Sequence, residues 1–383
     1  MSGIYIHIPF CKQACHYCDF HFSTSLKKKG EMVAALAKEI ELRNNPITHH
    51  PSPITETIET IYFGGGTPSI LQIADLKFLI DAVYRNYKVA ENPEITVEAN
   101  PDDLDEKTIV ELANSPVNRL SIGIQSFFED DLKLMNRAHN AEEAKKCLEI
   151  ASQYFDNISI DLIYGIPNMS NEKWEQNIET ALSFGVPHIS SYALTVEPKT
   201  ALHSFIKEGM IPQPDDEVAH EHFQILVDKL SANNFIHYEL SNFGKDTFFS
   251  KNNSSYWLGK NYIGIGPSAH SYDGVNRGWN VSNNSLYIKS IQENKLPIEI
   301  ETLTKTDRYN EYVMTGLRTI WGVSLERVEY EFGKAYLDYL NQQAAKFIED
   351  HLLFIDENIM LTTKKGKYLC DGIASDLFLL NLE

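Results

Sequence analysis

The chain has 383 residues, of which 43% are hydrophobic, and its formal net charge is -19 at pH 7. A chain of this length can bury a large core and form one large domain with a smaller one. The acidic charge argues against nucleic acid as a partner, because a protein binds phosphates through an excess of Lys and Arg. No apolar run approaches the ~20 residues that cross a bilayer, so we predict no membrane span.

Six short β-rich runs alternate with helical patterns in the first half of the chain. The predicted strands are residues 4–8, 60–63, 95–98, 119–124, 158–163 and 188–194. Helical periodicity lies between them at residues 32–43, 74–87, 105–113, 141–151 and 171–184. Repeated βα units predict an α/β fold with a parallel sheet and right-handed crossovers. Six units are too few for a complete eight-stranded barrel, so we predict an open, partial (β/α)6 barrel of the TIM type.

The pattern changes in the second half of the chain. We predict a helix at residues 216–233 and a strand at 235–241, followed by a polar and aromatic segment. Beyond it, helical runs at 306–320, 325–332 and 335–350 precede a hairpin at 352–361, which predicts an α+β domain of winged-helix shape. The expected division is a barrel at 1–240, a segment at 241–303 that closes the barrel, and a C-terminal domain at 304–383. We expect the last domain to serve for structure or docking rather than for DNA binding.

Three cysteines, Cys11, Cys15 and Cys18, form a CxxxCxxC arrangement directly after the first predicted strand. This spacing does not suit a disulfide framework. We therefore expect a reducing, cytoplasmic location. A cubane 4Fe-4S cluster normally takes four cysteines, so three would leave one iron without a protein ligand. The amine and carboxylate of S-adenosylmethionine can fill that position. The alternative is a structural zinc site in which His16 or His21 is the fourth ligand.

Polar, glycine and small residues follow the predicted strands, and ligand sites gather at these strand ends in βα barrels. Gly65, Gly66 and Thr67 follow the second strand. Their backbone N–H groups could approach a ligand closely, because glycine has no Cβ. A tight turn explains the two glycines equally well.

Five further side chains are candidates to surround the cofactor. Glu98 could accept a hydrogen bond from the amine, and Asp161 or Gln125 could bind the ribose or the amine. Polar residues at the ends of buried parallel strands are unusual without a partner. Arg137 could pair with the carboxylate, with a surface salt bridge as the alternative. Tyr17 could lie against the adenine.

The motifs together resemble the radical S-adenosylmethionine proteins related to oxygen-independent coproporphyrinogen III oxidase. The matching segments are IYIHIPFC at 4–11, CHYC at 15–18, FGGGTP at 63–68, VEANP at 97–101, RLSIGIQSF at 119–127 and DLIYGIP at 161–167. The resemblance covers nearly the whole chain and implies a partial barrel with a C-terminal domain, a 4Fe-4S cluster on the three cysteines and S-adenosylmethionine beside it. The implied cofactor contacts are Tyr5, Tyr17, Gly65, Gly66, Thr67, Glu98, Gln125, Arg137 and Asp161, with Ala193 and His270 as further candidates.

Two branches of this family differ in function. The true oxidase has a CxxxCxxCxC pattern, whereas this chain has Phe20 at the position of the last cysteine. The resemblance therefore points to the heme chaperone branch, which binds heme and hands it to acceptor proteins. Oxidative decarboxylation of coproporphyrinogen III is the alternative function.

The heme ligand differs from the family pattern. The chaperone branch typically has an HNxxYW motif, and Asn252 stands here in place of its histidine. An amide is a poor ligand for heme iron. His270 or His237 is therefore a candidate ligand, and weaker or absent heme binding is the alternative.

The predicted chemistry needs partners. An electron delivered to the cluster would cleave the sulfonium of S-adenosylmethionine and release a 5'-deoxyadenosyl radical, while the protein orients the cofactor and excludes water. The predicted partners are therefore an electron donor, heme or another porphyrin, and heme-acceptor proteins. The sequence leaves open whether the chain is a turnover enzyme and whether it forms a homodimer.

Overall fold

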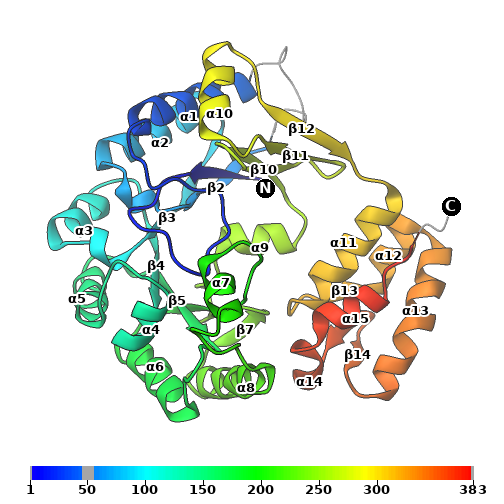
Figure 1. Cartoon of the computed structure of the whole chain (residues 1–383). Helices are drawn as coiled ribbons and strands as arrows, with labels where there is room; N and C mark the ends of the chain where they lie inside the picture. Colours follow the sequence, from blue (N-terminus) through cyan, green and yellow to red (C-terminus); the bar gives the residue numbers. More distant parts are fainter. Residues whose placement is uncertain (1, 45–55, 381–383) are drawn as a thin grey trace.

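A parallel sheet forms the centre of the computed structural model, which describes residues 2–44 and 56–380. Six of its strands lie side by side in chain order and run parallel. They are β1 Ser2–Ile8, β2 Ile58–Gly65, β3 Val89–Ala99, β4 Arg119–Gln125, β5 Ile158–Tyr164 and β6 His188–Ala193. Figure 1 shows helices arranged around the outside of these strands. The predicted α/β fold and its six strands are confirmed.

The first strand shows how the sequence produces this arrangement. Ile4, Ile6 and Ile8 are buried in the main hydrophobic core, which also contains side chains of the first helix. Tyr5 and His7 alternate with the isoleucines, so they point to the opposite face of the sheet. Isoleucine also favours the extended backbone. The strand therefore separates an apolar face, packed against helices, from a polar face inside the barrel.

Helices connect the parallel strands, and several begin at a polar cap. Their bounds are α1 Lys29–Arg43, α2 Ile73–Asn86, α3 Glu106–Ala113, α4 Glu129–Leu134, α5 Ala141–Ala151, α6 Asn171–Ser183, α7 Ala201–Lys207 and α8 Asp216–Ala232, with short 3-10 turns η1 Pro68–Ile70 and η2 Pro101–Asp103. At the start of α5, Asn140 and Glu143 form a capping box. Helices α4 and α7 were not predicted, because 6 and 7 residues are too few to show helical periodicity.

The central sheet extends at both edges beyond the six predicted strands. Next to β1 lie β9 Asn261–Ile265, β10 His270–Tyr272, β11 Asn276–Asn280 and β12 Ile298–Thr302, and next to β6 lie β8 Asn242–Gly244 and β7 Ile236–Glu239. Strand β9 pairs parallel with β1, whereas the other added strands are antiparallel to their neighbours. The helices α9 Lys251–Trp257 and α10 Asn284–Gln292 lie between these strands in the chain. The segment that we expected to close the barrel therefore adds strands to both edges of the sheet.

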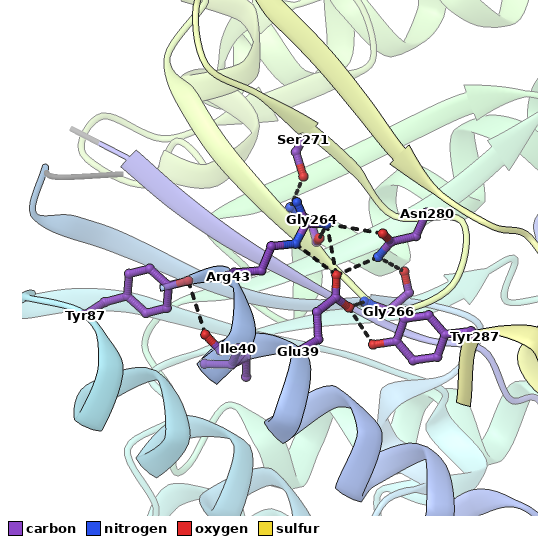
Figure 2. A network of polar contacts seen from close by, with 9 residues as sticks. All are labelled: Glu39, Ile40, Arg43, Tyr87, Gly264, Gly266, Ser271, Asn280 and Tyr287. Carbon is purple, nitrogen blue, oxygen red and sulfur yellow. Dashed lines mark hydrogen bonds and ion pairs between the residues drawn. The ribbon is translucent and has the colours of Figure 1, made fainter. Parts of the chain in front are cut away.

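A buried polar network attaches this extension to α1 (Figure 2). The carboxylate of Glu39 is fully buried and accepts hydrogen bonds from Arg43 Nη2 at 2.9 Å and from the Gly266 N–H at 2.8 Å. It also accepts from Asn280 Nδ2 at 2.8 Å and from the Tyr287 hydroxyl at 2.5 Å. A carboxylate removed from water needs such donors, because its desolvation costs several kcal/mol. The network thereby fixes β11, α10 and the end of β9 against α1.

The C-terminal part has a second hydrophobic core, formed by buried side chains between Tyr309 and Leu377. Its elements are α11 Lys305–Leu317, β13 Val323–Ser324, α12 Leu325–Phe332, α13 Lys334–Glu349, β14 Leu353–Asp356, β15 Ile359–Thr362, α14 Lys364–Lys367 and α15 Cys370–Asp376. Strands β14 and β15 form the predicted hairpin, and β13 pairs with β15 as a third strand. Figure 1 shows these elements in orange and red on one side of the barrel. The division at residues 240 and 303 stays a prediction.

None of the helices formed by the described residues combines the length and the apolar character that a bilayer span requires.

Candidate functional site

The carboxyl ends of β1 to β5 surround one cavity, as expected for a βα barrel. It is lined by Cys11, Gln13, Cys15, Tyr17, Cys18, Phe20, Phe22, Gly65, Gly66, Thr67, Pro68, Glu98, Ala99, Asn100, Ser121, Gly123, Gln125, Arg137 and Asp161. All three cysteines and most of the predicted cofactor contacts are therefore brought together by the fold.

The cysteine loop is fixed although it has little regular secondary structure. The Cys11 N–H donates to the Ser23 carbonyl at 3.1 Å, which closes the loop near its start. The His16 N–H donates to the Met135 carbonyl at 3.1 Å. The loop is thus held both to itself and to the segment after α4, so its thiols have defined positions at the rim of the cavity.

The zinc alternative requires a histidine of this loop to lie close to the three thiols. His16 Nδ1 lies 2.8 Å from the Leu134 carbonyl, and His21 Nε2 lies 2.8 Å from Asn284 Oδ1. Over residues 2–44 and 56–380, no three Cys, His, Asp or Glu side chains lie close enough to hold one metal ion. A cluster does not need such closeness, because each cysteine binds a different iron. The arrangement of the thiols therefore fits an iron-sulfur cluster better than a single ion.

Two of the three thiols, Cys11 and Cys18, have raised pKa values because they are partly buried. Burial raises the pKa of Cys18 to about 11, and it also raises the pKa of Cys11 above its ordinary value. Metal ligation requires thiolates, so a cluster must displace these protons.

Arg137 joins the cysteine loop to the barrel. Its Nη2 donates to Asn100 Oδ1 at 2.6 Å and to the Gly123 carbonyl at 3.0 Å. Its Nη1 lies 3.3 Å from Cys15 Sγ and 3.5 Å from the Tyr17 hydroxyl. Its Nε is buried and has no hydrogen-bond partner within the part of the chain that the structure describes. The surface salt bridge that we considered for this residue is wrong, and the unused donor suits a ligand carboxylate.

Glu98 and Asp161 are two half-buried carboxyl groups inside the barrel. Glu98 accepts hydrogen bonds from the Tyr62 hydroxyl at 2.8 Å and from the Gly65 N–H at 3.2 Å. Burial, together with the charge of Asp161, raises the pKa of Glu98 to about 7. Burial also raises the pKa of Asp161 to about 6, although a hydrogen bond with Ser190 opposes this shift. Both groups ionise near neutral pH, so they can balance a positive ligand such as a sulfonium or an amine.

The hydrogen bonds of the glycine loop fit the tight-turn alternative. The Gly65 N–H donates to the carboxylate of Glu98. The N–H groups of Gly66 and Thr67 donate to the Ile8 and Phe10 carbonyls at 2.9 and 2.7 Å. These donors are therefore not free for a ligand. The lack of a Cβ serves the contact with the cysteine loop instead, because a Cβ on Gly66 would lie 2.6 Å from the Phe10 oxygen. Gly65 also has a φ of 104°, which L-residues rarely adopt.

Strand β4 contributes alternate residues to the cavity: Ser121, Gly123 and Gln125. Gln125 has a φ of 65°, which is uncommon for a residue with a Cβ. Such backbone strain gathers at ligand sites. Sequence reasoning missed Ser121 and Gly123. Both could have been found from Gln125, because every second residue of a strand points to the same face. Sequence reasoning also missed Asn100, whose role as partner of Arg137 has no local signal.

Three predicted contacts do not line this cavity. The Tyr5 hydroxyl lies 3.2 Å from His7 Nδ1, and the Tyr5 ring stacks on Tyr62 with 6.1 Å between the centroids. Ala193 ends β6 and is half-buried, and His270 is exposed on β10. The fold thus keeps Tyr5 inside the barrel next to the site, while it places His270 on an added strand.

The candidate heme ligands differ in their accessibility. The His237 ring stacks on Phe243 at 4.1 Å, and its Nε2 lies 3.0 Å from a backbone carbonyl. Burial lowers the pKa of His237 to about 3. Asn252 is buried as well, and its Oδ1 accepts a hydrogen bond from Thr60 at 3.0 Å. Of the two candidate histidines, His270 is the exposed one.

Comparison with known proteins agrees with this site. The radical SAM superfamily matches residues 5–181, and the HemN C-terminal domain matches residues 303–369. The fold is similar to that of coproporphyrinogen III oxidase (HemN) from Escherichia coli, with a TM-score of 0.83 and 22% identity, over 98% of this chain and 90% of that one. Together, the fold and the cysteine loop define a protein of the radical SAM class.

The sequence relatives identify the branch. The chain is 36% identical to heme chaperone HemW of Bacillus subtilis, over 96% of this chain and 97% of that relative. It is 33% identical to heme chaperone HemW of Lactococcus lactis, over 99% of this chain and 97% of that relative. The chain therefore belongs to the HemW family of heme chaperones, which confirms the branch predicted from the sequence.

Proposed function

We propose that the chain binds a 4Fe-4S cluster through Cys11, Cys15 and Cys18, binds S-adenosylmethionine beside it, and binds heme that it transfers to acceptor proteins. The observation that carries this proposal is the cavity that the three cysteines share with the half-buried carboxyl groups of Glu98 and Asp161. Membership of the HemW family supports the heme part, since the relatives are named for that function.

Different residues around the cavity bind different groups of the cofactor. The negative charges of Glu98 and Asp161 attract its cationic centre, and the unused donor of Arg137 is directed to its carboxylate. Gln125 supplies a hydrogen bond to the ribose or amine, and Tyr17 supplies a ring for the adenine. When bound, the cluster supplies one-electron chemistry.

Several parts of the proposal concern partners and location. They are an electron donor, a heme-acceptor protein, a cytoplasmic location and, as an open possibility, a homodimer. Tyr5 and Ala193 remain candidate contacts of the bound cofactor, because Tyr5 belongs to β1, which borders the cavity, and Ala193 pairs with Tyr164 on the neighbouring strand β5.

The experiment is an anaerobic reconstitution followed by heme loading and transfer. We expect the reconstituted protein to bind S-adenosylmethionine, to take up heme and to load a heme-free b-type cytochrome faster than free heme does. We expect no vinyl-bearing product when the reduced protein is incubated with coproporphyrinogen III and S-adenosylmethionine. A vinyl-bearing product would establish the oxidase alternative, and failure of heme uptake would contradict the chaperone function.

A further inference from the structure

Arg119 is a buried arginine inside the barrel, at the first position of β4. It is 1% exposed and is one of the largest residues that the protein buries completely. Within residues 2–44 and 56–380, its Nε and Nη1 are shielded from water and have no hydrogen-bond partner. Arginine is almost never fully buried unless it is paired, because a charge loses its hydration inside a protein. An apolar residue would avoid this cost, so the charge itself needs an explanation.

The register of the strands places Arg119 directly below the candidate site. Ser121 lines the cavity, and Arg119 precedes it by two residues, so both point to the inner face of β4. Ser121 pairs with Glu98 on β3 and with Ser159 on β5. Asp161 follows Ser159 by two residues on the same face. Since two residues of a strand span roughly 7 Å, Arg119 lies one layer of side chains below Glu98 and two layers below Asp161.

The positive charge of Arg119 acts on both of these carboxyl groups. Burial raises the pKa of Glu98 to about 7, and the charge of Arg119 opposes this rise. Burial raises the pKa of Asp161 to about 6, and the charges of Arg119 and Arg137 oppose this rise as well. The two carboxyl groups also repel each other, since the charge of Asp161 raises the pKa of Glu98. A cation beneath them makes it easier for both to be ionised at the same time.

The other titratable groups that interact with Arg119 or with the two carboxyl groups are neutral. Burial raises the pKa of the tyrosines, which are Tyr5, Tyr62, Tyr192, Tyr238 and Tyr256. Burial and the charge of Arg119 lower the pKa of His188 well below its ordinary value. Its Nδ1 lies 2.6 Å from Ser159 Oγ, and its Nε2 lies 2.8 Å from the Tyr238 hydroxyl. His188 therefore adds no positive charge beneath the carboxyl groups.

Resting on the proposed binding of S-adenosylmethionine, we propose that Arg119 is a positioning residue for this cofactor. Its buried guanidinium keeps Glu98 and Asp161 ionised, so that both carboxylates can attract the cationic centre of the ligand. Arg119 does not line the cavity itself, so it acts through these two side chains. Loss of its charge should therefore weaken binding only at pH values at which the carboxyl groups take up protons.

The test is equilibrium dialysis of S-adenosylmethionine against the reconstituted full-length chain at pH 7, 8 and 9, with the iron content of each sample measured. Arg119→Met removes the charge, and an apolar side chain often replaces a buried charge without loss of stability. We expect this variant to bind roughly tenfold more weakly than the wild type at pH 7, because a nearby opposite charge lowers the pKa of each carboxyl group by roughly one or more. At pH 9 both carboxyl groups are ionised, and we expect the two affinities to agree within roughly twofold.

Two further variants serve as controls. Arg119→Lys keeps the positive charge, so it should keep the pH profile of the wild type. Arg85→Met is the matched control, because Arg85 is exposed on α2, and it should match the wild type at every pH. Thermal unfolding checks that each variant is folded, and Arg119→Gln takes the place of Arg119→Met if the latter is not.

The outcomes separate this role from the proposed function. If the wild type binds S-adenosylmethionine and Arg119→Met has the same pH profile, the positioning role is wrong and the proposed function stands. An equal loss of affinity at pH 7 and pH 9, or unfolding of both uncharged variants, would assign Arg119 to structure alone and overturn the proposal in the same way. If the wild type binds no S-adenosylmethionine at any pH, the proposed function itself fails.

Discussion

Replacing Glu98 with Gln tests how the cavity recognises a cationic cofactor. Gln keeps the size of the side chain, and its oxygen can still accept the hydrogen bond that the Tyr62 hydroxyl makes at 2.8 Å. The variant should therefore fold. It loses the negative charge, however, and we assign that charge to the binding of S-adenosylmethionine.

The magnitude follows from the pKa of the carboxyl groups. The pKa of Glu98 is raised to about 7 by burial, so this carboxyl group loses its charge as the pH falls through that value. Its ionised fraction is roughly 0.9 at pH 8 and roughly 0.1 at pH 6, and an apparent Kd rises as the competent fraction falls. Glu98 alone should thus weaken binding roughly tenfold between pH 8 and pH 6. Asp161, whose pKa is raised to about 6 by burial, adds a factor of about two over the same range.

The assay is equilibrium dialysis of S-adenosylmethionine against the reconstituted protein at pH 6, 7 and 8. The wild type and Glu98→Gln are compared at each pH, so that titration of the ligand and the cluster cancels. We expect the variant to bind more weakly at pH 8 and to keep only the twofold dependence contributed by Asp161. A variant that matches the wild type at pH 8, or that keeps the tenfold dependence, would refute this role of Glu98.

Two further predictions concern the frame around the site. Arg43→Met should lower the free energy of unfolding by about 3–5 kcal/mol, because it leaves the buried carboxylate of Glu39 without its ion-pair partner. Urea unfolding measures this change. A loss below about 1 kcal/mol would contradict the network in Figure 2. Arg137→Met should weaken S-adenosylmethionine binding roughly tenfold or more while the iron content stays near that of the wild type. Unchanged affinity would show that Arg137 only supports the cysteine loop.

The barrel could be predicted from the sequence because its signals are local. In β1, the alternation of Ile4, Ile6 and Ile8 with polar residues defines a strand within a few positions. The pairing of β9 with β1 could not be predicted, since it joins segments more than 250 residues apart in the chain. Such a pairing depends on long-range contacts, among them the network around Glu39, that no local pattern reports.

In the candidate site, too, the sequence could predict residues that have a local signal but not contacts that depend on the fold. Glu98, Gln125 and Asp161 could be found because each is a polar residue at or near the end of a buried strand. For Gly66 the sequence left a ligand contact and a tight turn open, because the sequence does not tell whether an N–H is free. That depends on the Ile8 carbonyl, which only the fold brings to 2.9 Å.

The most direct test of the central claim is the iron and sulfide content of the anaerobically reconstituted protein, with the electron paramagnetic resonance spectrum of its reduced form recorded before and after addition of S-adenosylmethionine. We expect about four irons and about four sulfides per chain, a spectrum that changes when the cofactor is added, and loss of this cluster in Cys15→Ala. Zinc without sulfide, or a cluster whose spectrum does not respond to S-adenosylmethionine, would contradict the claim that Cys11, Cys15 and Cys18 leave one iron open to the cavity.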